Sequence, residues 1–529
     1  MKEPTMRLTF FLLLILISQA TGRTAESRPP NIVFFLVDDL GWSDVGCFGS
    51  SFYETPNIDR LATEGVKFTH AYAACHVCSP TRASILTGKY PASLKLTDWL
   101  PGRRDFPFQK LKNAPNLQQL PLEELTLAEA LKQQGYATGH FGKWHLGEDE
   151  FGPLQQGFDV QVPRNWYKGW PKAGFQAPFE MDGLEDQPGD YLTDRLTDEA
   201  LKFIEANRGN SFFLYLSHFA VHDPIQGRSD LVQKYREKQS KIIRTRSGPE
   251  FILEGNPDDP EPLSREELDA MIQRPGYAGF KVLPKHTVKI KQQQDNIEFA
   301  AMVEAMDQSL GRVMEKLEAL DLAEDTIVIF FSDNGGMAAM NLGNPQRRVG
   351  HEKTDEAFSG ANLPLRGAKG WLYEGGIRVP LIVKWPGEGK AGTVCEEPVI
   401  SIDMLPTLLE MAGLEDVASG GRDGVSFASA VKGEAFERGT IYWHFPHYSN
   451  HGMQSPGGAI REGDWKLLEY FENGTVQLFN LREDIGEQND LAGKMPEKMA
   501  ELKQKLASWR ASVSASMMPP NPDYQPTQP

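Results

Sequence analysis

The sequence predicts an α/β protein in which a large, mostly parallel sheet is flanked by helices and followed by a smaller C-terminal antiparallel α+β subdomain. Two short segments, 31–37 (NIVFFLV) and 326–332 (TIVIFFS), are continuously apolar and rich in β-forming residues, as is typical of strands buried on both faces. Strand-like and helix-like segments alternate along most of the chain, and this order produces parallel sheets. Beyond about residue 413, glycine-rich turns lead to short strands, which predicts a second, antiparallel unit.

The other elements follow from local patterns. We expect further strands at 137–142, 212–217 and 380–385, and helices at 57–66, 126–134 and 295–320. Thr126 with Glu129 three residues later forms a capping box, and the apolar residues of 295–320 recur at the spacing of a core-facing stripe. In the C-terminal unit we expect strands at 440–444, 465–470 and 476–481, followed by a helix at 496–512.

The N-terminus has the features of a secretory signal peptide over residues 1–20. Lys2 and Arg7 precede an apolar run at 8–17, and Ser18-Gln19-Ala20 fits the pattern before a cleavage point. The run is short for a membrane span, which needs about 20 residues, so an uncleaved anchor is the weaker alternative. We expect an exported protein (periplasmic, secreted or in a lysosome-like compartment, according to host) with no transmembrane helix in the mature chain. Its main domain covers 29–430, with a charged insertion at 226–294, a C-terminal subdomain at 431–517 and a Pro-rich, disordered tail at 518–529.

Charge and cysteine content exclude several classes of protein. The formal net charge of −17 argues against a nucleic-acid partner, because such proteins need a basic surface. Four cysteines in 529 residues do not make a disulfide scaffold, although one pair is able to form a bridge. Cys75 and Cys78 have the spacing of half a zinc site, but no second Cys-x-x-Cys completes it.

Paired oxygen donors follow two of the predicted strands. Asp38 and Asp39 come directly after 31–37, and Asp333 and Asn334 come after 326–332. Ligands of α/β sheets bind beyond the carboxyl ends of the strands, so adjacent strands would bring these four side chains together. Carboxylate and amide oxygens suit Ca²⁺ or Mg²⁺ better than zinc. The alternative is that these residues only form the turns that end the strands.

The segment 74–88 (ACHVCSPTRASILTG) begins a helix. Pro80 lies at or near its first position, and Ser79 is a candidate cap. Cys78 then lies where free N–H groups and the helix dipole favour an anion, and Arg82 lies one turn further on the same face. The alternative is a buried structural cysteine.

Six motifs occur in an order that resembles the sulfatase family. The chain contains DDLG (38–41), CSPTR (78–82) continuing to LTGK (86–89), GKWHLG (142–147), HDP (222–224), SDNG (332–335), and LRGAKG (365–370) with YEGG (373–376). The CSPTR segment is similar to the Cys-x-Pro-x-Arg signature of that family. The resemblance covers residues 31–407 and implies an alkaline-phosphatase-like fold with a small C-terminal subdomain.

The resemblance also implies a mechanism. In this mechanism Cys78 is converted to formylglycine by a formylglycine-generating enzyme. One hydroxyl of the hydrated aldehyde attacks the sulfur of the sulfate ester, and the alcohol leaves. The other hydroxyl then loses its proton and expels sulfate. Ca²⁺ is held by Asp38, Asp39, Asp333 and Asn334 and contacts residue 78. The remaining roles are sulfate binding by Lys143 and Lys369, stabilisation of the diol oxygens by Arg82, hydrogen bonding between His145 and one diol hydroxyl, and protonation of the leaving alcohol by His222.

The expected function is therefore hydrolysis of a sulfate ester, on a sulfated glycan or a small sulfated molecule. One alternative is a phosphate-ester hydrolase of the same superfamily that uses an unmodified nucleophile; another is an exported protein that never receives the modification at Cys78 and only binds sulfated glycans. We assign the acid role to His222 rather than His218, and treat His444 and His447 as weak candidates for pocket residues. A further hypothesis is that basic residues of the insertion contact additional sulfates of a polymer; they are Lys234, Arg236, Lys238, Lys241, Arg244 and Arg246.

Overall fold

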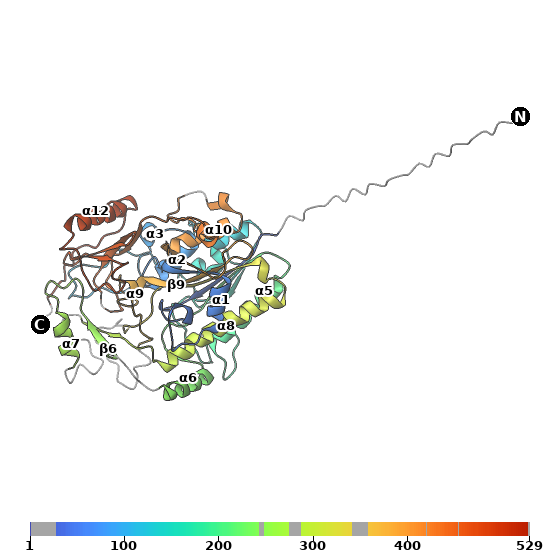
Figure 1. Cartoon of the computed structure of the whole chain (residues 1–529), viewed down its shortest axis with the longest axis horizontal. Coiled ribbons are helices and arrows are strands. Elements are labelled where there is room, and N and C mark those ends of the chain that lie inside the picture. Colours follow the sequence, from blue (N-terminus) through green and yellow to red (C-terminus); the bar gives the residue numbers. More distant parts are fainter. Residues whose placement is uncertain are drawn as a thin grey trace.

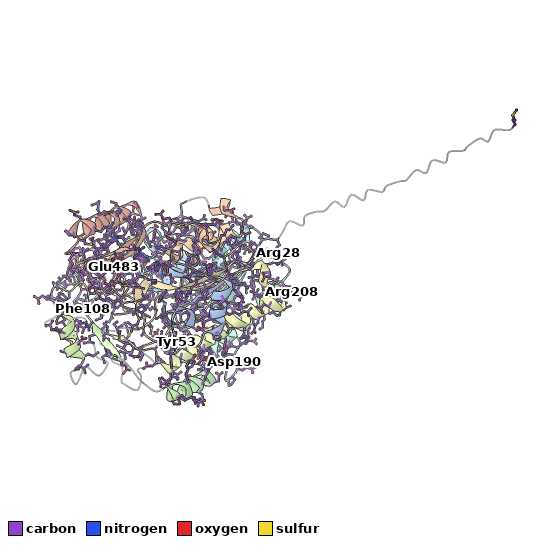
Figure 2. All side chains as sticks on the ribbon, in the orientation of Figure 1. Arg28, Tyr53, Phe108, Asp190, Arg208 and Glu483 are labelled. Atoms are coloured by element: carbon purple, nitrogen blue, oxygen red, sulfur yellow. The ribbon has the colours of Figure 1, made fainter. Side chains whose placement is uncertain are left out.

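The computed structural model describes, besides Met1, residues 28–242, 248–273, 287–340, 358–418, 421–452 and 454–526. Residues 2–20 of the expected signal peptide, together with Arg244 and Arg246, lie outside the described residues. Arg28 lies at the edge of the folded body near Arg208 (Figure 2), and its guanidinium donates a hydrogen bond of 3.3 Å to the Arg208 carbonyl. Among the described residues, none of the helices has the length and hydrophobicity required to cross a membrane.

A mixed, mostly parallel sheet forms the centre of the molecule and confirms the predicted fold class. Within the described residues its strands run in the order β10-β2-β9-β8-β1-β5-β3-β4, and β11 also pairs with β2. Only the pairs β2–β9 and β8–β9 are antiparallel. The strands are β1 (Asn31–Val37), β2 (Val66–Tyr72), β3 (Ala137–Gly142), β4 (Val160–Val162), β5 (Phe212–Ser217), β8 (Thr326–Ser332), β9 (Arg378–Lys384), β10 (Thr393–Cys395) and β11 (Val399–Ile400).

Helices cover both faces of this sheet (Figure 1). Alternate side chains of β1 and β5 pack on one side against α1 (Pro56–Glu64), α5 (Leu192–Ala206) and α8 (Ile297–Ala319). The intervening side chains pack on the other side against α2 (Cys78–Thr87), α4 (Leu127–Gln133) and α10 (Met404–Met411). Because both faces are buried, the central strands are continuously apolar. Three short helices also occur: α3 (Pro91–Leu94), α9 (Glu374–Ile377) and α11 (Ala428–Val431).

The C-terminal unit is an antiparallel sheet covered by one helix. The sheet has the order β12-β13-β14-β15 and consists of β12 (Ile441–Phe445), β13 (Gly457–Glu462), β14 (Trp465–Tyr470) and β15 (Val476–Asn480). Leu502 and Leu506 of α12 (Pro496–Ser512) pack on it. The sequence analysis misses β13, because the strand begins with two glycines, which are weak strand formers.

The charged insertion expected at 226–294 contains several regular elements among its described residues. It contains α6 (Ser229–Lys241), α7 (Arg265–Ile272) and an antiparallel pair, β6 (Phe251–Glu254) and β7 (Val288–Lys291). Lys234 is paired with Glu54 and Glu304, and Lys238 with Glu54. These two cations already have protein partners, which weakens the hypothesis that this helix contacts additional sulfates.

The expected disordered tail differs from the structure over residues 518–526. The amide of Lys112 donates to the Pro519 carbonyl (2.9 Å), and the amide of Asn521 donates to the Lys110 carbonyl (2.8 Å). The Asn521 side chain donates two further hydrogen bonds to the backbone of residues 106 and 109. The proline-rich composition of the tail predicts that it forms no core of its own. Residues 518–526 are instead held against the loop 106–112 by hydrogen bonds to the backbone.

Candidate active site

The two acidic pairs lie side by side at the carboxyl ends of β1 and β8. These strands are parallel neighbours, and Val37 is in register with Ser332, so the residues that follow them meet. The amide of Asp39 donates to Asp333 Oδ1 (3.3 Å), and Asn334 Nδ2 donates to Asp39 Oδ1 (2.8 Å). Asp39 has φ of 63°, a left-handed conformation that non-glycine residues adopt rarely and mainly at functional sites.

This cluster suits a hard cation. Asp38, Asp39, Asp333 and Asn334 are fully buried, yet Asp38 Oδ1 and Asn334 Oδ1 have no hydrogen-bond partner among the described residues. Buried oxygens without donors are costly unless a ligand satisfies them. One possible ligand atom from each of Asp38, Asp333 and Cys78 lies within 4.8 Å of the other two.

Burial and the neighbouring Asp333 raise the pKa of Asp38 well above its usual value, which a bound cation would offset. The oxygen donors fit Ca²⁺ or Mg²⁺.

Cys78 is the first residue of α2, and the expected cap at Ser79 is wrong. Val77 occupies the N-cap position without a side-chain hydrogen bond. The Ser79 hydroxyl instead accepts a hydrogen bond from the amide of Leu100 (3.2 Å), because the loop after α3 packs on the start of the helix. All four cysteines of the chain are free, so no pair forms a bridge.

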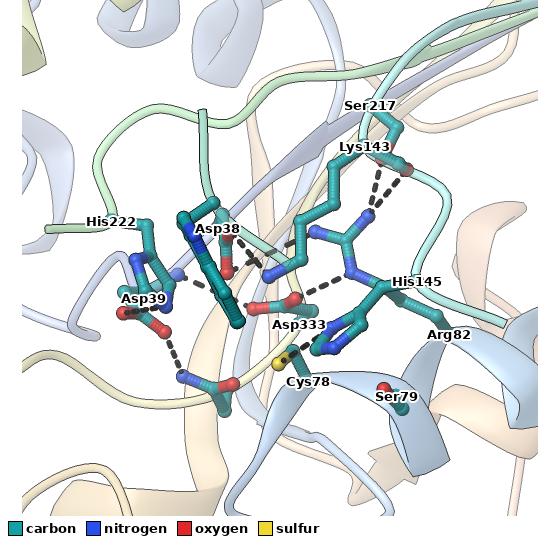
Figure 3. A network of polar contacts seen from close by, with 12 residues as sticks. Asp38, Asp39, Cys78, Ser79, Arg82, Lys143, His145, Ser217, His222 and Asp333 are labelled. Atoms are coloured by element: carbon teal, nitrogen blue, oxygen red, sulfur yellow. Dashed lines mark hydrogen bonds and ion pairs between the residues drawn. The ribbon is translucent and has the colours of Figure 1, made fainter. Parts of the chain in front are cut away.

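Arg82 lies one turn after Cys78 and joins several parts of the site (Figure 3). Its Nε donates to Asp333 Oδ2 (2.8 Å), and its Nη1 donates to the Lys143 carbonyl (3.0 Å). It also donates to the hydroxyl of Ser217, the last residue of β5, which the sequence analysis did not identify. Opposing effects act on its pKa: burial lowers it, whereas Asp333 and Asp38 raise it, and the net change is upward. Arg82 is therefore a permanent buried cation.

Two lysines are brought to the acidic cluster, as the motifs imply. Lys143 Nζ lies 2.6 Å from Asp38 Oδ2, and Lys369 Nζ lies 2.6 Å from Asp39 Oδ1. Burial alone would lower the pKa of Lys369, but Asp39, Cys78 and Asp38 together outweigh it and the pKa is raised. Together with Arg82, these lysines balance the three carboxylates, so a divalent cation added to the cluster makes the site positively charged and able to attract an anion.

Gly142, which precedes Lys143, is required by the close approach of β3 to β5. Its φ is +108°, and a Cβ there would lie 1.9 Å from the Ser217 carbonyl oxygen. The amide of Lys143 donates to that same carbonyl (2.7 Å). A glycine at this position thus allows the backbone to deliver Lys143 into the site.

We expect Gly142→Ala to lower the free energy of unfolding by about 3 kcal/mol or more, measured by urea denaturation, because it combines a backbone clash with positive-φ strain. Gly135→Ala is the matched control: Gly135 has φ of +85°, but a Cβ added there would have no neighbour within 4 Å, so strain alone should cost about 1 kcal/mol. Equal losses in the two variants would contradict the proposed clash.

His145 contacts the thiol of Cys78. Its Nε2 donates to the Leu100 carbonyl (2.6 Å), which leaves Nδ1 as an acceptor 3.3 Å from Cys78 Sγ. Burial and then the positive charge of Lys143 hold the pKa of His145 well below its usual value. The ring is therefore neutral and able to accept a proton or hydrogen bond from the group at position 78.

His222 lies on the other side of the acidic cluster and is held by Asp223. Its Nδ1 is 2.7 Å from Asp223 Oδ1, and its Nε2 is 3.7 Å from Asp39 Oδ2. Burial and Lys369 lower its pKa, but the carboxylates around it, among them Asp39, Asp223 and Asp38, together raise the pKa of His222 to about 9. A protonated imidazole here is a proton donor, and Asp223 orients it, a role that sequence reasoning did not assign.

The remaining histidine predictions have mixed outcomes. His218 donates to or accepts from the Ser309 hydroxyl (2.9 Å) within the core, in agreement with its exclusion from the site. His444 Nε2 donates to the Ser516 carbonyl (2.8 Å), and His447 Nε2 lies 2.8 Å from the Thr97 hydroxyl. Both side chains bind parts of the protein outside the acidic cluster: His444, in β12, and His447, two residues after its end, are bonded to other segments of the chain.

Comparison with known proteins assigns the family. A family model described as "Sulfatase" matches residues 30–414, and one described as "N-sulphoglucosamine sulphohydrolase, C-terminal" matches residues 368–512. A protein named "Sulfatase" from Formosa agariphila is 30% identical over 96% of this chain and 94% of its own length. Mouse steryl-sulfatase is 29% identical, with coverage of 87% and 74%, and the N-acetylglucosamine-6-O-sulfatase of Bacteroides thetaiotaomicron is 27% identical, with coverage of 95% and 90%.

A solved structure agrees with this assignment. The crystal structure of Ps i-CgsB superimposes with a TM-score of 0.65 at 26% identity, covering 94% of each chain, and another structure of that protein contains k-i-k-neocarrahexaose. The family model covers most of the chain, and the acidic pairs, Cys78, Arg82 and the two lysines meet in one buried cluster. The chain therefore belongs to the sulfatase family of sulfuric ester hydrolases.

Proposed function

We propose that this protein hydrolyses sulfate esters of carbohydrates, with residue 78 acting as formylglycine and with Ca²⁺ held by Asp38, Asp39, Asp333 and Asn334. The observation that carries the proposal is the position of Cys78. Its Sγ lies within 4.8 Å of a carboxylate oxygen of Asp38 and of one of Asp333, and it contacts His145. When present, formylglycine supplies a hydrated aldehyde as nucleophile, and Ca²⁺ supplies a Lewis acid and a template for the sulfate.

The side chains of the protein bind and orient the anionic substrate. Lys143, Lys369 and Arg82 are preorganised by their ion pairs with the three aspartates, so their ammonium and guanidinium groups need little rearrangement as charge develops on sulfate. His222 donates a proton to the leaving alcohol oxygen, and Asp223 holds its ring in place. His145 accepts a hydrogen bond at position 78.

The choice of a carbohydrate substrate follows from the relatives. One is named N-acetylglucosamine-6-O-sulfatase, others are named N-acetylgalactosamine-6-sulfatase, and Ps i-CgsB was solved with a carrageenan-type hexaose. We further propose that the protein is exported, on the basis of the signal peptide predicted at residues 1–20, and that a formylglycine-generating enzyme acts on it before folding buries Cys78.

Hydrolysis assays with and without a chelator test this proposal. We expect turnover of 4-nitrophenyl sulfate and of at least one sugar from a panel of D-glucosamine 6-sulfate, N-acetylgalactosamine 6-sulfate and the carrageenan hexaose. EDTA should remove most of the activity and excess Ca²⁺ should restore it. Ca²⁺ at about 100 times its Kd should also stabilise the fold by about 2.7 kcal/mol.

The two alternative functions predict different results in the same assay. Preferential hydrolysis of 4-nitrophenyl phosphate would support the phosphate-ester hydrolase. Binding of the sulfated sugars without turnover, in protein from its own host whose residue 78 is an unmodified cysteine, would support the binding protein. Activity that is unaffected by EDTA and by Ca²⁺ would contradict the proposed metal site.

A further inference from the structure

His451, in the loop between β12 and β13, is a buried imidazole whose ring nitrogens have no hydrogen-bond partner in the part of the chain that the structure describes. Its side chain is 5% exposed, and neither Nδ1 nor Nε2 has a hydrogen-bond partner among the described residues. Buried polar side chains are almost always hydrogen-bonded, and the exceptions often occupy ligand sites. His444 offers a contrast: it belongs to the same subdomain and is also 5% exposed, but its Nε2 is bonded to the Ser516 carbonyl.

The loop places His451 directly against the segment that carries Lys369. A Cβ added to Gly370 would lie 2.5 Å from both Cβ and the carbonyl oxygen of His451. Gly370 follows Lys369, whose Nζ contacts Asp39 at 2.6 Å. His451 thus lies next to the segment that delivers Lys369 to the acidic cluster, and the charges of Lys369, Asp39, Asp223 and His222 act on its ring, in agreement with this position.

The backbone around His451 is held in place by specific hydrogen bonds. The Ser449 hydroxyl accepts from the His451 amide (3.2 Å) and donates to the His451 carbonyl (2.9 Å). The Ser449 carbonyl in turn accepts from Nη1 of the buried Arg103 (2.8 Å). This arrangement fixes the loop while the ring nitrogens remain without partners among the described residues, as expected for a preorganised binding group.

We propose that His451 determines substrate specificity by hydrogen bonding to hydroxyl groups of the sugar that carries the sulfate. The inference rests on the proposed function and specifies which part of the protein recognises the alcohol portion of the substrate. A neutral imidazole has one N–H donor and one nitrogen acceptor, and a sugar offers hydroxyls that complement both. An aryl sulfate offers no such hydroxyls on its leaving group.

The charge state of the ring agrees with this role. Burial and then the positive charge of Lys369 hold the pKa of His451 well below its usual value, so the ring keeps both a donor and an acceptor at neutral pH. A protonated ring would have two donors and no acceptor.

The test compares two substrates on the same preparation of each variant. The ratio of kcat/KM for the best sugar of the panel to kcat/KM for 4-nitrophenyl sulfate is independent of the fraction of protein that carries formylglycine. We expect His451→Ala to lower this ratio about 10- to 100-fold, because a site that loses its hydrogen bonds to a substrate hydroxyl loses discrimination. His451→Asn retains a donor and an acceptor and should recover part of the ratio.

His444→Ala is the control, and its ratio should stay within about twofold of the wild type, because its imidazole is bonded to the protein and not to the site. If the His451 variants lose activity equally on both substrates, or keep the wild-type ratio, His451 has a structural role and the inference is overturned. If the wild-type protein carries formylglycine and hydrolyses neither substrate, the proposed function fails instead. His451→Asn also keeps the test informative if the alanine variant does not fold.

Discussion

Replacement of Cys78 with alanine is expected to abolish hydrolysis of sulfate esters, lowering kcat/KM by at least about 1,000-fold. The side chain at this position lies between the acidic cluster and His145, so its removal takes away the proposed nucleophile. The fold should tolerate the change, with a loss of about 1–2 kcal/mol in the free energy of unfolding, because only one buried sulfur atom is removed. Cys78→Ser should also be inactive, since a serine sulfate ester lacks the second hydroxyl that would expel sulfate.

Cys75→Ala is the matched control. Cys75 is buried three residues earlier and packs against Val77 and Phe445, so its removal should leave kcat/KM within a few-fold of the wild type. In the wild type, mass spectrometry of the tryptic peptide 68–82 should find Cys75 alkylated and residue 78 with the mass and hydrazine reactivity of an aldehyde. An active protein in which both cysteines are fully alkylated would refute the formylglycine mechanism.

Replacement of Arg82 with methionine is expected to lower the free energy of unfolding by about 3–5 kcal/mol and to remove nearly all activity. The guanidinium is 1% exposed and paired with Asp333, so the variant leaves a buried carboxylate without its counter-charge. The loss should be smaller in saturating Ca²⁺, because the bound cation partly replaces the missing positive charge. Urea denaturation with and without Ca²⁺ measures both effects.

Arg60→Met provides the comparison on the surface. Arg60 is paired with Glu64 and Glu318, but its side chain is 43% exposed, so this change should cost no more than about 1 kcal/mol. A similar, Ca²⁺-independent loss for both variants would show that the Arg82 ion pair contributes no more than an exposed one.

Much of the fold was predictable because its elements depend on local composition. Strands β1, β3, β5 and β8 have the predicted bounds, as does α12, and the capping box at Thr126 is present. Segments buried on both faces must be apolar throughout, and this pattern can be read without knowledge of their neighbours. Strand β2 was missed, since its partly exposed residues alternate irregularly and it begins two residues after α1, where a continued helix was expected.

The candidate site could be predicted from the sequence where its residues belong to recognisable motifs. The sequence by itself determined which residue types are present: the acidic pairs, Cys78 with Arg82 one turn later, and the lysine and histidine motifs. It also determined that the acidic pairs follow strands, which places them at one edge of a parallel sheet.

Only the tertiary structure decided which side chains complete the cluster. Ser217 contacts Arg82 because β5 is the neighbour of β1, and Asp223 orients His222 across a turn whose shape local composition does not specify. His451 reaches the vicinity of Lys369 from a loop of the C-terminal subdomain, more than 80 positions later in the chain. The Ser217 and His451 contacts arise from packing between distant segments, and a local pattern holds no information about a partner that the fold supplies from elsewhere.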